Sequence, residues 1–343
     1  MQQLSNLDVF FLVKELNSEL AGSRLANFYG EGNVFRFKLG PKNLLIDFEK
    51  GIYLADSFPD APMTPSSFVM FFRKRLDNAR FVAATQLNCD RIIALEFEKQ
   101  EKFFVVLELF RQGNLLFCDE KMEIQAVLKP ADYASRHLKR GYAYQTPPSG
   151  KKSVFSLEAS DLLSIKGPLV AALSKVVNLS PFYLEESCKR LGLEFDKTSL
   201  SKEDARGLVA EIKGFFSELK PFVYYENGIP TCFASFKLEK FGGKVFKEFP
   251  LLSSALQEYY TKQVKAVSEK KDHVANQQES ALLEFEEKSM EARRKAEWLY
   301  ENFSLVEKVL EAAKDGNSEE ELNSLAEGVF KVEKKHREIV IEV

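Results

Sequence analysis

The last third of this 343-residue chain contains a long stretch without helix breakers, since neither glycine nor proline occurs from Leu251 to Lys314. Both residues destabilise the interior of a helix, so their joint absence over such a length predicts long helices. Residues 261–300 carry eight basic and eight acidic side chains, a balance that is typical of a solvated helical surface. The part before residue 251 is interrupted by many turn residues, and we expect it to fold differently.

Residues 1–150 alternate between helical and strand-like segments. Ser5 and Asp8 form the pattern of a capping box at the start of a first helix, and Thr64 followed by Pro65 predicts the start of a second. This order of helix, strands, helix and strands indicates an α+β fold rather than the regular alternation of a doubly wound sheet. Aromatic and β-branched residues between turn signals predict the strands at 24–29, 33–39, 43–48, 81–87, 91–97, 103–110, 114–118 and 123–128.

A loose segment rich in proline, glycine and lysine, 141–152, predicts a domain boundary, and we place the first domain at 1–150. Residues 151–220 have the pattern of short helices and could form a helix-hairpin-helix unit. Strand-like composition returns in 222–250, and we expect it to complete the sheet of the first domain, so that 221–254 belongs to that domain. The expected helices of the insert begin near Gly167, at Ser180-Pro181, and at the capping box of Ser201 and Asp204.

Residues 255–343 have the pattern of a coiled-coil region. After a turn at 315–317, Ser318 predicts the cap of another helix, so we expect an antiparallel helical hairpin over 255–337. The last residues, 339–343, are typical of a strand, and because a strand needs a sheet we expect the natural chain to continue. The coiled-coil seam has alternating spacings of four and three, at Phe285, Ser289, Ala292, Ala296, Leu299, Phe303, Val306 and Leu310.

Cysteine and histidine usage argues against several kinds of enzyme and metal site. No CxxC pair, GxSxG motif or HExxH motif is present, so we expect no catalytic residue, no metal and no cofactor. The net charge of −3 excludes attraction to nucleic acid by the overall field, and any such contact needs local basic patches. The residues concerned are Cys89, Cys118, Cys188, Cys232, His137, His273 and His336.

The chain also lacks membrane and export signals. No apolar run approaches the roughly 18 residues that span a bilayer, and the N-terminus has neither the basic nor the apolar region of a secretory signal. We therefore expect a soluble cytoplasmic protein without a membrane partner.

Four parts of the chain stand out together, namely 8–16 with 20–25, 64–76, 90–93 and 108–119. In this order and spacing they resemble the N-terminal domain of the NFACT family, which contains ribosome-associated quality-control factors and is often labelled fibronectin-binding protein A, N-terminal. Residues 112–114, Gln-Gly-Asn, depart from the bacterial pattern and are closer to archaeal or eukaryotic members. Residues 249–260 resemble the segment that leads into the coiled coil of the family, and 297–302 resemble its coiled-coil motif.

The resemblance implies the fold of formamidopyrimidine-DNA glycosylase, a helix-hairpin-helix insert and a coiled-coil middle. It implies a non-enzymatic factor that binds obstructed large ribosomal subunits carrying peptidyl-tRNA and recruits tRNA, of alanyl type, for template-free C-terminal tailing. Bond formation would then belong to the ribosome, in agreement with the missing catalytic motifs. The tRNA contacts implied by the resemblance are Asp90, Arg91, Glu108, Leu109 and Phe110.

The chemistry of these residues leaves alternatives open. Asp90 and Arg91 alternate at the start of a strand, where they could form an ordinary polar edge or present a planar guanidinium to a phosphate or base. Glu108 interrupts the apolar strand 105–110. Its carboxylate needs hydrogen bonds there, so it either forms a salt bridge at the edge of the core or faces a ligand.

Two local basic patches are the candidates for contact with an RNA backbone. Either can be a solvated face, but Tyr133, Tyr142 and Tyr144 are interleaved with the second and suit stacking on RNA. Between residues 129 and 152, six cations face only Asp132. The candidate residues are Arg73, Lys74, Arg75, Arg80, Arg136, Lys139, Arg140, Lys151 and Lys152.

Two other classes of protein fit part of the resemblance. A DNA glycosylase of this fold needs an N-terminal proline nucleophile and a zinc finger, whereas the chain begins Met1-Gln2 and its cysteines are scattered, so we expect no DNA partner. A fibronectin-binding surface adhesin would match the label of the family, but it would need an export route that the N-terminus does not supply.

Overall fold

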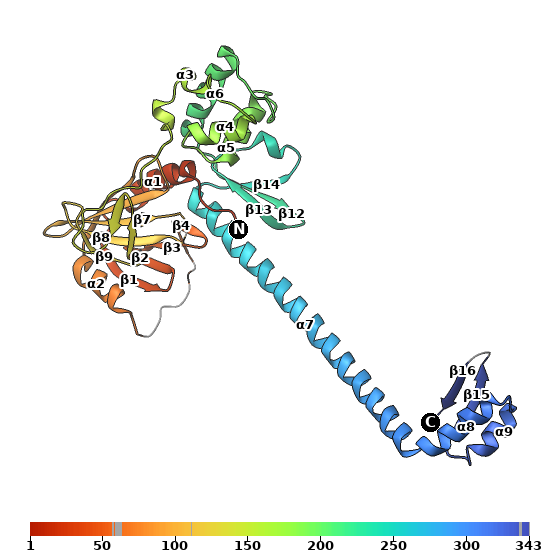
Figure 1. Ribbon diagram of the computed structural model, residues 1–343. Helices are drawn as coiled ribbons and strands as arrows, with labels where there is room; N and C mark the ends of the chain where they lie inside the picture. Colours follow the sequence, from red (N-terminus) through yellow and green to blue (C-terminus); the bar gives the residue numbers. More distant parts are fainter. Residues whose placement is uncertain (57, 59–63, 111, 336–337, 343) are drawn as a thin grey trace. The chain divides into compact units, whose positions relative to one another are not determined.

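The computed structural model describes the chain except for residues 57, 59–63, 111, 336–337 and 343. The chain divides into two compact units, residues 1–266 and 267–343, which are described separately below (Figure 1). Among the described residues, no helix combines the length and the apolar character that crossing a membrane requires.

The first unit contains two antiparallel sheets in which each strand pairs with its neighbours in the chain. The first sheet has the order β1 (Leu25–Glu31), β2 (Val34–Leu39), β3 (Lys42–Asp47), β4 (Gly51–Leu54). The second has the order β5 (Arg80–Gln86), β6 (Ile92–Glu98), β7 (Lys102–Glu108), β8 (Asn114–Cys118), β9 (Ile124–Val127). The eight predicted strands are confirmed with small shifts at their ends. The sequence did not predict β4, nor the hairpin of β10 (Ala131–Tyr133) and β11 (Arg136–Leu138).

Helix α1 (Asn6–Leu20) begins at the predicted capping box, in which Ser5 and Asp8 bond each other's backbone N–H. Helix α2 (Ser67–Leu76) begins later than predicted, because the hydroxyl of Ser66 caps it by accepting the N–H of Val69. Helix α2 also joins the two sheets. The ring of Phe72 stacks on Phe28 of the first sheet at 4.8 Å and meets Phe117 of the second sheet edge-on at 5.2 Å.

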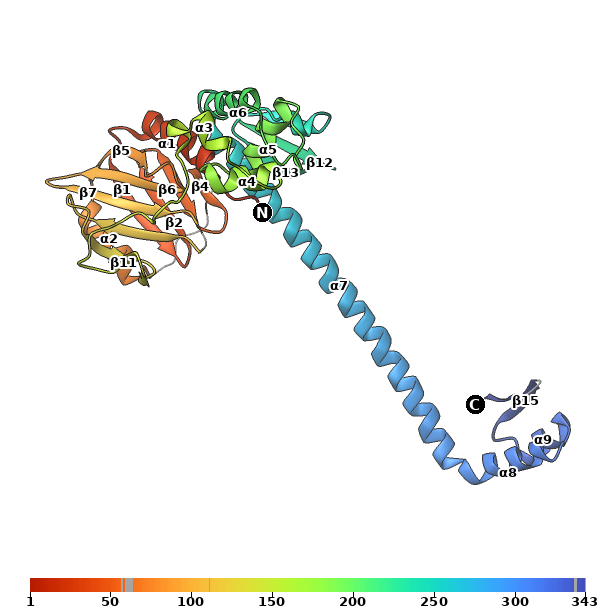
Figure 2. The ribbon, with the colours of Figure 1, turned by 45° about the horizontal axis from the view of Figure 1, so that its top comes forward.

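The helical insert contains α3 (Ala159–Leu162), α4 (Leu169–Val176), α5 (Pro181–Arg190) and α6 (Lys202–Gly214), with the short 3-10 helices η1 (Val154–Ser156) and η2 (Phe215–Ser217). Helix α5 begins at Pro181 after Ser180, and Ser201 and Asp204 form the capping box of α6, as predicted. Figure 2 shows these helices grouped with α1 at one side of the two sheets. The helix-hairpin-helix interpretation stays a prediction.

The strands of 222–250 form a sheet of their own, so the expectation that they complete a sheet of 1–150 is wrong. The sheet has the order β13 (Ile229–Ala234), β12 (Phe222–Glu226), β14 (Val245–Glu248). A turn at Asn227-Gly228, both with positive φ, lets β12 pair locally with β13, and β14 occupies the other edge of β12. The sheet still contacts the N-terminus, because the side-chain amide of Gln2 bonds the backbone of Phe233.

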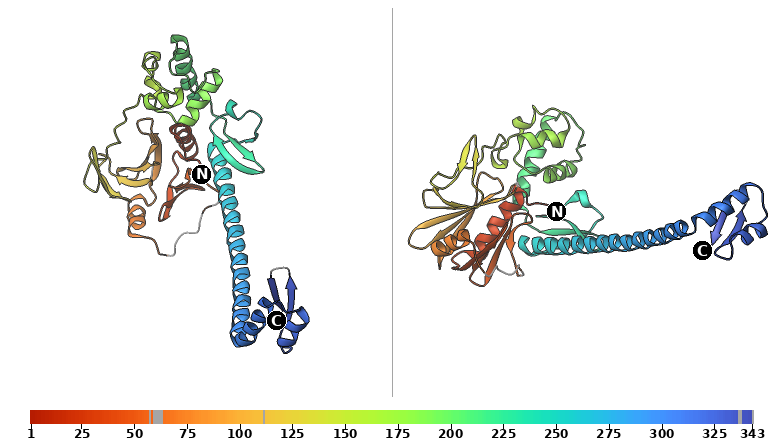
Figure 3. Two further views of the ribbon diagram at one scale, coloured as in Figure 1. Left: turned by 45° about the vertical axis from the view of Figure 1, so that its right-hand side comes forward. Right: turned by 60° about the horizontal axis from the view of Figure 1, so that its bottom comes forward.

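Helix α7 (Leu252–Glu301) starts against this third sheet (Figure 3), where Phe233 meets the rings of Tyr259 and Tyr260. The carboxylate of Glu15 on α1 accepts the backbone N–H groups of Leu252 at 2.7 Å and Ser253 at 3.2 Å. A negative charge at a helix N-terminus is stabilised by the helix dipole and by unpaired N–H groups. Burial raises the pKa of Glu15, and these hydrogen bonds oppose that shift.

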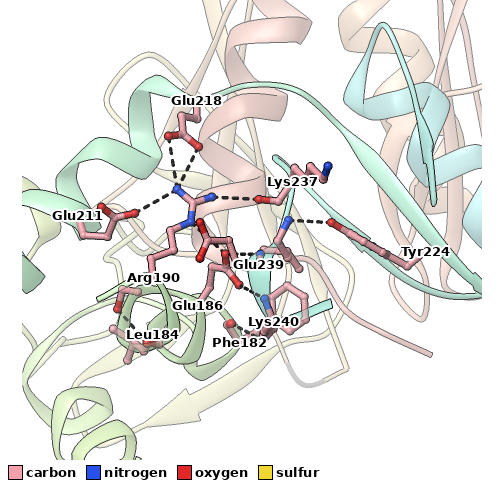
Figure 4. A network of polar contacts seen from close by, with 12 residues as sticks. Phe182, Leu184, Glu186, Arg190, Glu211, Glu218, Tyr224, Lys237, Glu239 and Lys240 are labelled. Carbon is pink, nitrogen blue, oxygen red and sulfur yellow. Dashed lines mark hydrogen bonds and ion pairs between the residues drawn. The ribbon is translucent and has the colours of Figure 1, made fainter. Parts of the chain in front are cut away.

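A polar network joins the helical insert to the segment between β13 and β14. Figure 4 shows the guanidinium of Arg190, on α5, at the centre of this network. Arg190 donates to Glu186 one turn earlier, to Glu211 on α6 and to the carbonyl of Lys237, each at 3.0 Å. Glu218 lies 3.4 Å away and completes the shell of acceptors. The insert is therefore tied to the sheet by directional contacts as well as by apolar packing.

Glu186 is the buried acceptor of this network. Besides Arg190, it accepts the backbone N–H of Glu239 at 2.7 Å and of Lys240 at 3.1 Å, where the turn η3 (Glu239–Phe241) begins. Arg190 and the N–H of Glu239 donate to one carboxylate oxygen of Glu186, and the N–H of Lys240 donates to the other. Both oxygens must therefore be acceptors, as they are in an ionised carboxylate.

The second unit corrects the prediction of an antiparallel helical hairpin over 255–337. After α8 (Phe303–Lys314) and a turn, α9 (Glu319–Leu325) has only seven residues and is followed by the hairpin of β15 (Lys331–Lys335) and β16 (Glu338–Glu342). The cap at Ser318 and the terminal strand are confirmed. Helix and hairpin share a small core of Val306, Val309, Leu322, Ala326, Phe330 and Val332.

The predicted seam is largely solvent-exposed in this unit. Phe285 is 72% exposed and Phe303 is 55% exposed, whereas Val306 is buried against α9. The sequence pattern missed the β-hairpin because Val332, which fits a helical stripe, pairs with Ile341 in a strand. His336, Arg337 and Val343, which the prediction included, lie outside the described residues.

Replacing Glu186 by Gln is expected to lower the free energy of unfolding by about 2–4 kcal/mol, because an amide NH₂ would face backbone donors in a buried position. The matched control is Glu185→Gln on the same helix turn, where the side chain is 42% exposed and pairs with Lys240. That control should cost about 1 kcal/mol or less. Urea denaturation of both variants measures the difference, and equal losses would contradict the assignment.

Candidate nucleic-acid site

A pocket of about 530 Å³ collects residues from four separate parts of the first unit. Asp90 and Arg91 line it together with Lys151 from the loop that the sequence assigned to the second basic patch. The structure therefore brings two independently predicted groups into one site. The other lining residues are 147–150 of the same loop and the segments 3–6 and 178–181, at the N-terminal ends of α1 and α5.

The turn that leads into Asp90 has an unusual backbone. Asn88 and Cys89 have φ values of 51° and 52°, in the left-handed region that non-glycine residues seldom occupy. Such conformations cost free energy and persist only where the surroundings hold them. The N–H of Leu87 and the carbonyl of Ile92 close the base of the turn at 2.9 Å.

Three side-chain amides hold this turn, and we call them the amide clamp: Asn6, Gln86 and Asn178. Asn6 and Asn178 each donate to the carbonyl of Cys89 at 3.1 Å. Gln86 donates to the carbonyl of Asp90 at 2.9 Å. Asn6 is the first residue of α1, and Asn178 lies in the loop before α5. The first helix and the insert therefore position the turn together. Sequence reasoning missed the clamp, because its members are far apart in the chain and carry no motif.

The charges of the pocket favour an anion. The carboxylate of Asp90 accepts the backbone N–H of Arg91 at 2.7 Å and does not pair with its guanidinium. Within the described residues, the guanidinium of Arg91 and the ammonium group of Lys151 form no ion pair or hydrogen bond. Helix α5 begins at the pocket without an acidic residue in its first turn, and its N-terminus adds positive partial charge. This arrangement suits a phosphate group close to hydrogen-bonding groups.

Glu108 is part of a buried ion pair with Arg136, one of the alternatives that the sequence left open. Arg136 Nη2 lies 3.1 Å from Glu108 Oε2, and the other nitrogen bonds Oε1. The hydroxyl of Tyr144 donates to Glu108 at 2.9 Å. Burial and the nearby Glu108 carboxylate raise the pKa of Tyr144. Arg136 is only 6% exposed, so its prediction as part of a surface patch is wrong.

Leu109 and Phe110 follow directly and are half-buried. The N–H of Leu109 donates to the carbonyl of Arg91 at 2.8 Å, so this tripeptide runs beside the Asp90–Arg91 pair. Glu108 therefore stabilises the end of β7 from inside the protein. The pocket lies beside it, at Asp90 and Arg91 before the neighbouring strand β6.

The two predicted basic patches are smaller than the sequence suggested. Counting charges along the sequence missed carboxylates that are close only in space. Within the described part of the chain, five of the predicted cations form no ion pair: Arg73, Lys74, Arg75, Arg140 and Lys151. The other four are paired: Arg80 with Glu98, Arg136 with Glu108, Lys139 with Asp132 and Lys152 with Asp161.

The described histidines and cysteines do not gather into a group of metal ligands. No cluster of three His, Cys, Asp or Glu side chains with suitable geometry occurs where the structure is described. His137 lies at 2.9 Å from Asp132 on the surface. Burial raises the pKa of Cys118 and of Cys232 to about 12, so these thiols are packed as apolar groups.

The fold defines an α+β protein of antiparallel sheets with a helical insert and a following long helix. The family described as NFACT N-terminal and middle domains matches residues 5–338, and this chain belongs to it.

The archaeal Rqc2 homolog aRqcH of Methanocaldococcus jannaschii is 25% identical over 346 residues, covering 90% of this chain and 52% of that protein. Ribosome quality control complex subunit 2 of Saccharomyces cerevisiae is 36% identical over 133 residues, covering 37% of this chain and 13% of that protein. The chain thus spans about half the length of the archaeal relative and a smaller part of the yeast one.

Solved structures support the fold. The fibrinogen binding protein from Staphylococcus aureus matches with a TM-score of 0.62 and 18% identity, covering 75% of this chain and 98% of that chain. The N-terminal part of the fibronectin/fibrinogen-binding protein from Streptococcus suis matches with a TM-score of 0.56 and 18% identity, covering 75% and 99%. At this identity the likeness shows the fold alone, and the formamidopyrimidine-DNA glycosylase likeness stays a prediction.

Arg136→Met is expected to lower the free energy of unfolding by about 3–5 kcal/mol, because it leaves the carboxylate of Glu108 buried without its partner. Arg140→Met removes an exposed cation four residues away and should change stability by about 0.5 kcal/mol or less. Thermal and urea denaturation compare the two. If Arg136→Met is as stable as Arg140→Met, the buried pair does not form.

Proposed function

We propose that this chain is the N-terminal and middle part of a ribosome quality-control factor. Such a factor would bind large ribosomal subunits that carry peptidyl-tRNA and recruit tRNA, of alanyl type, for template-free C-terminal tailing. Membership of the family and the names of the archaeal and yeast relatives support this proposal. Bond formation would belong to the ribosome, so the chain would contribute binding and positioning.

The observation that carries the proposal is the guanidinium of Arg91, which has no ion-pair or hydrogen-bond partner among the described residues and lies in a pocket beside the turn that the amide clamp holds. A planar guanidinium recognises phosphate or a base edge through two parallel hydrogen bonds, provided that its position is fixed. Holding the turn in advance lowers the entropy lost when RNA binds. Lys151 would add a second contact to the same backbone.

The residues of the proposed site have different roles. Asp90 and Arg91 would contact tRNA, Asp90 by accepting from a base or ribose donor and by orienting the backbone of Arg91. Leu109 and Phe110 would contact tRNA beside Arg91, because the N–H of Leu109 bonds the carbonyl of Arg91. Glu108 would act from inside, since its carboxylate is occupied by Arg136 and Tyr144. Of the basic residues, Arg140 and Lys151 remain candidates for RNA backbone contacts on this side.

Replacing Asp90 and Arg91 together by Ala should lower the affinity for tRNA at least tenfold, because the pocket loses its guanidinium and the carboxylate beside it. Stability should change by about 1 kcal/mol or less, since both side chains are partly exposed. The matched control is Glu226→Ala with Lys244→Ala, a partly exposed ion pair between the end of β12 and the residue before β14, whose removal leaves the net charge equally unchanged.

Fluorescence anisotropy with bulk tRNA and urea denaturation measure the two effects in the whole chain, and sedimentation with large subunits tests association. A double variant that binds tRNA as the control does would contradict the assignment of the pocket. A collapse of stability would show that the pair is structural.

A further inference from the structure

A second group of unpaired cations lies on a different part of the first unit, on β2 and α2. We call this group, with the ring of Tyr29, the α2 surface: Tyr29, Arg36, Lys38, Arg73 and Lys74. Within the described residues none of its four cations forms an ion pair. Neighbouring cations on the same two sheets do form them, namely Lys42 with Glu19, Lys50 with Asp47, Arg80 with Glu98, Lys99 with Asp77 and Lys102 with Glu96.

Sheet geometry places the first three residues on one face. Tyr29 and Arg36 are direct cross-strand partners of β1 and β2, and Lys38 follows Arg36 by two residues. The alternate residues Phe35 and Phe37 point to the opposite face and are buried in the core. The face with the cations is therefore the outer one at these two strands.

Aromatic rings hold the guanidinium groups. The Cζ atom of Arg36 lies 4.0 Å from the ring centre of Tyr29 and 3.7 Å from that of Phe58. Arg73 lies 5.3 Å from the same tyrosine ring, and its Nε–H donates to the carbonyl of Phe28 at 2.7 Å. Stacking orients a guanidinium while leaving its in-plane N–H groups for an external acceptor.

An apolar groove adjoins these cations. It has a volume of about 840 Å³, lies between β1 and α2, and is lined by residues 25–28 together with Met70 and Phe71. Met70 is 49% exposed, although it is a large apolar side chain on a helix. Arg73 and Lys74 line the same groove, so apolar surface and unpaired positive charge lie side by side.

We propose that the α2 surface is a second RNA-binding surface that takes a single-stranded segment, with phosphates on Arg36, Lys38 and Lys74 and a base against Tyr29 or in the groove. Stacked rings among unpaired cations suit unpaired bases and a phosphate backbone better than a folded protein surface. The proposal rests on the proposed function in that it assumes an RNA partner. It shares no residue with the pocket of Asp90 and Arg91, so the two can be tested separately.

The test uses the whole chain and a fluorescein-labelled oligouridine of 12 nucleotides. Arg36→Glu with Lys74→Glu should weaken binding at least tenfold near 100 mM salt. The slope of log affinity against log salt should fall by about 1.4, since each phosphate contact on a single strand contributes about 0.7. The control, Lys166→Glu with Lys202→Glu, changes two exposed lysines of the insert by the same charge and should have a much smaller effect.

A third variant separates stacking from charge. Tyr29→Ala should weaken binding at least fivefold, because it removes both a stacking surface for a base and the ring that holds Arg36. Since all four cations remain, the salt slope should fall by less than it does in the charge reversal. Circular dichroism confirms that each variant is folded. If the charge reversals unfold the chain, Arg36→Gln with Lys74→Gln replaces them, with the same direction of effect expected.

The proposal is overturned if the charge reversal at Arg36 and Lys74 binds oligouridine as its control does. It is also overturned if a polyglutamate peptide of equal charge competes for this surface as well as oligouridine, since that result would assign an acidic protein partner. If the Asp90–Arg91 double variant loses oligouridine binding and the variant of Arg36 and Lys74 keeps it, the α2 surface is refuted and the proposed function stays intact. Loss in the α2 variant alone, with tRNA binding indifferent to Asp90 and Arg91, would support this surface and refute the pocket.

Discussion

One buried carboxylate, that of Asp8, connects three parts of the first unit that are far apart in the sequence. It accepts hydrogen bonds from the N–H of Ser5 at 2.8 Å and from its hydroxyl at 2.7 Å. It also accepts from the hydroxyl of Tyr183 on α5 at 2.6 Å and from that of Ser235, just after β13, at 2.7 Å. Burial raises the pKa of Asp8, and the hydrogen bonds oppose that shift. Since every partner donates, the group fixes how α1, α5 and β13 meet.

The position of the pocket depends on that junction. Ser5 and Asn6 at the start of α1 line the pocket, as do Ser180 and Pro181 at the start of α5. Asn6 also belongs to the amide clamp, so a shift of α1 would release the strained turn before Asp90. Glu15 and Glu186 act in the same way at other junctions, each accepting backbone N–H groups from a distant segment. Apolar burial drives the folding of the unit, and these carboxylates select one arrangement of its parts.

Local signals in the sequence predicted local structure well. The capping boxes at Ser5, Ser201 and Ser318 and most strand positions are confirmed, because caps and alternating patterns depend on neighbours in the chain. Contacts across the fold could not be predicted this way. The partners of Arg136 and Lys152 are carboxylates in other elements, so their surface charge was overestimated. The strand character of 222–250 and of 339–343 was predicted, but the pairing of these strands was not, because pairing depends on which edge is nearest in space.

The candidate site was only partly predictable, because part of it is a local motif and part depends on contacts between distant residues. The Asp90–Arg91 pair was found through its resemblance to a family motif, whereas the amide clamp and the α2 surface appear only once distant residues are brought together.

The binding of tRNA at the pocket of Asp90 and Arg91 can be tested by photo-crosslinking of the whole chain to tRNA that contains 4-thiouridine, followed by mass spectrometry of the linked peptides. We expect crosslinks in peptides that contain residues 86–91 and 147–151. Crosslinks confined to peptides outside these two segments, such as 202–214 on α6, would contradict it.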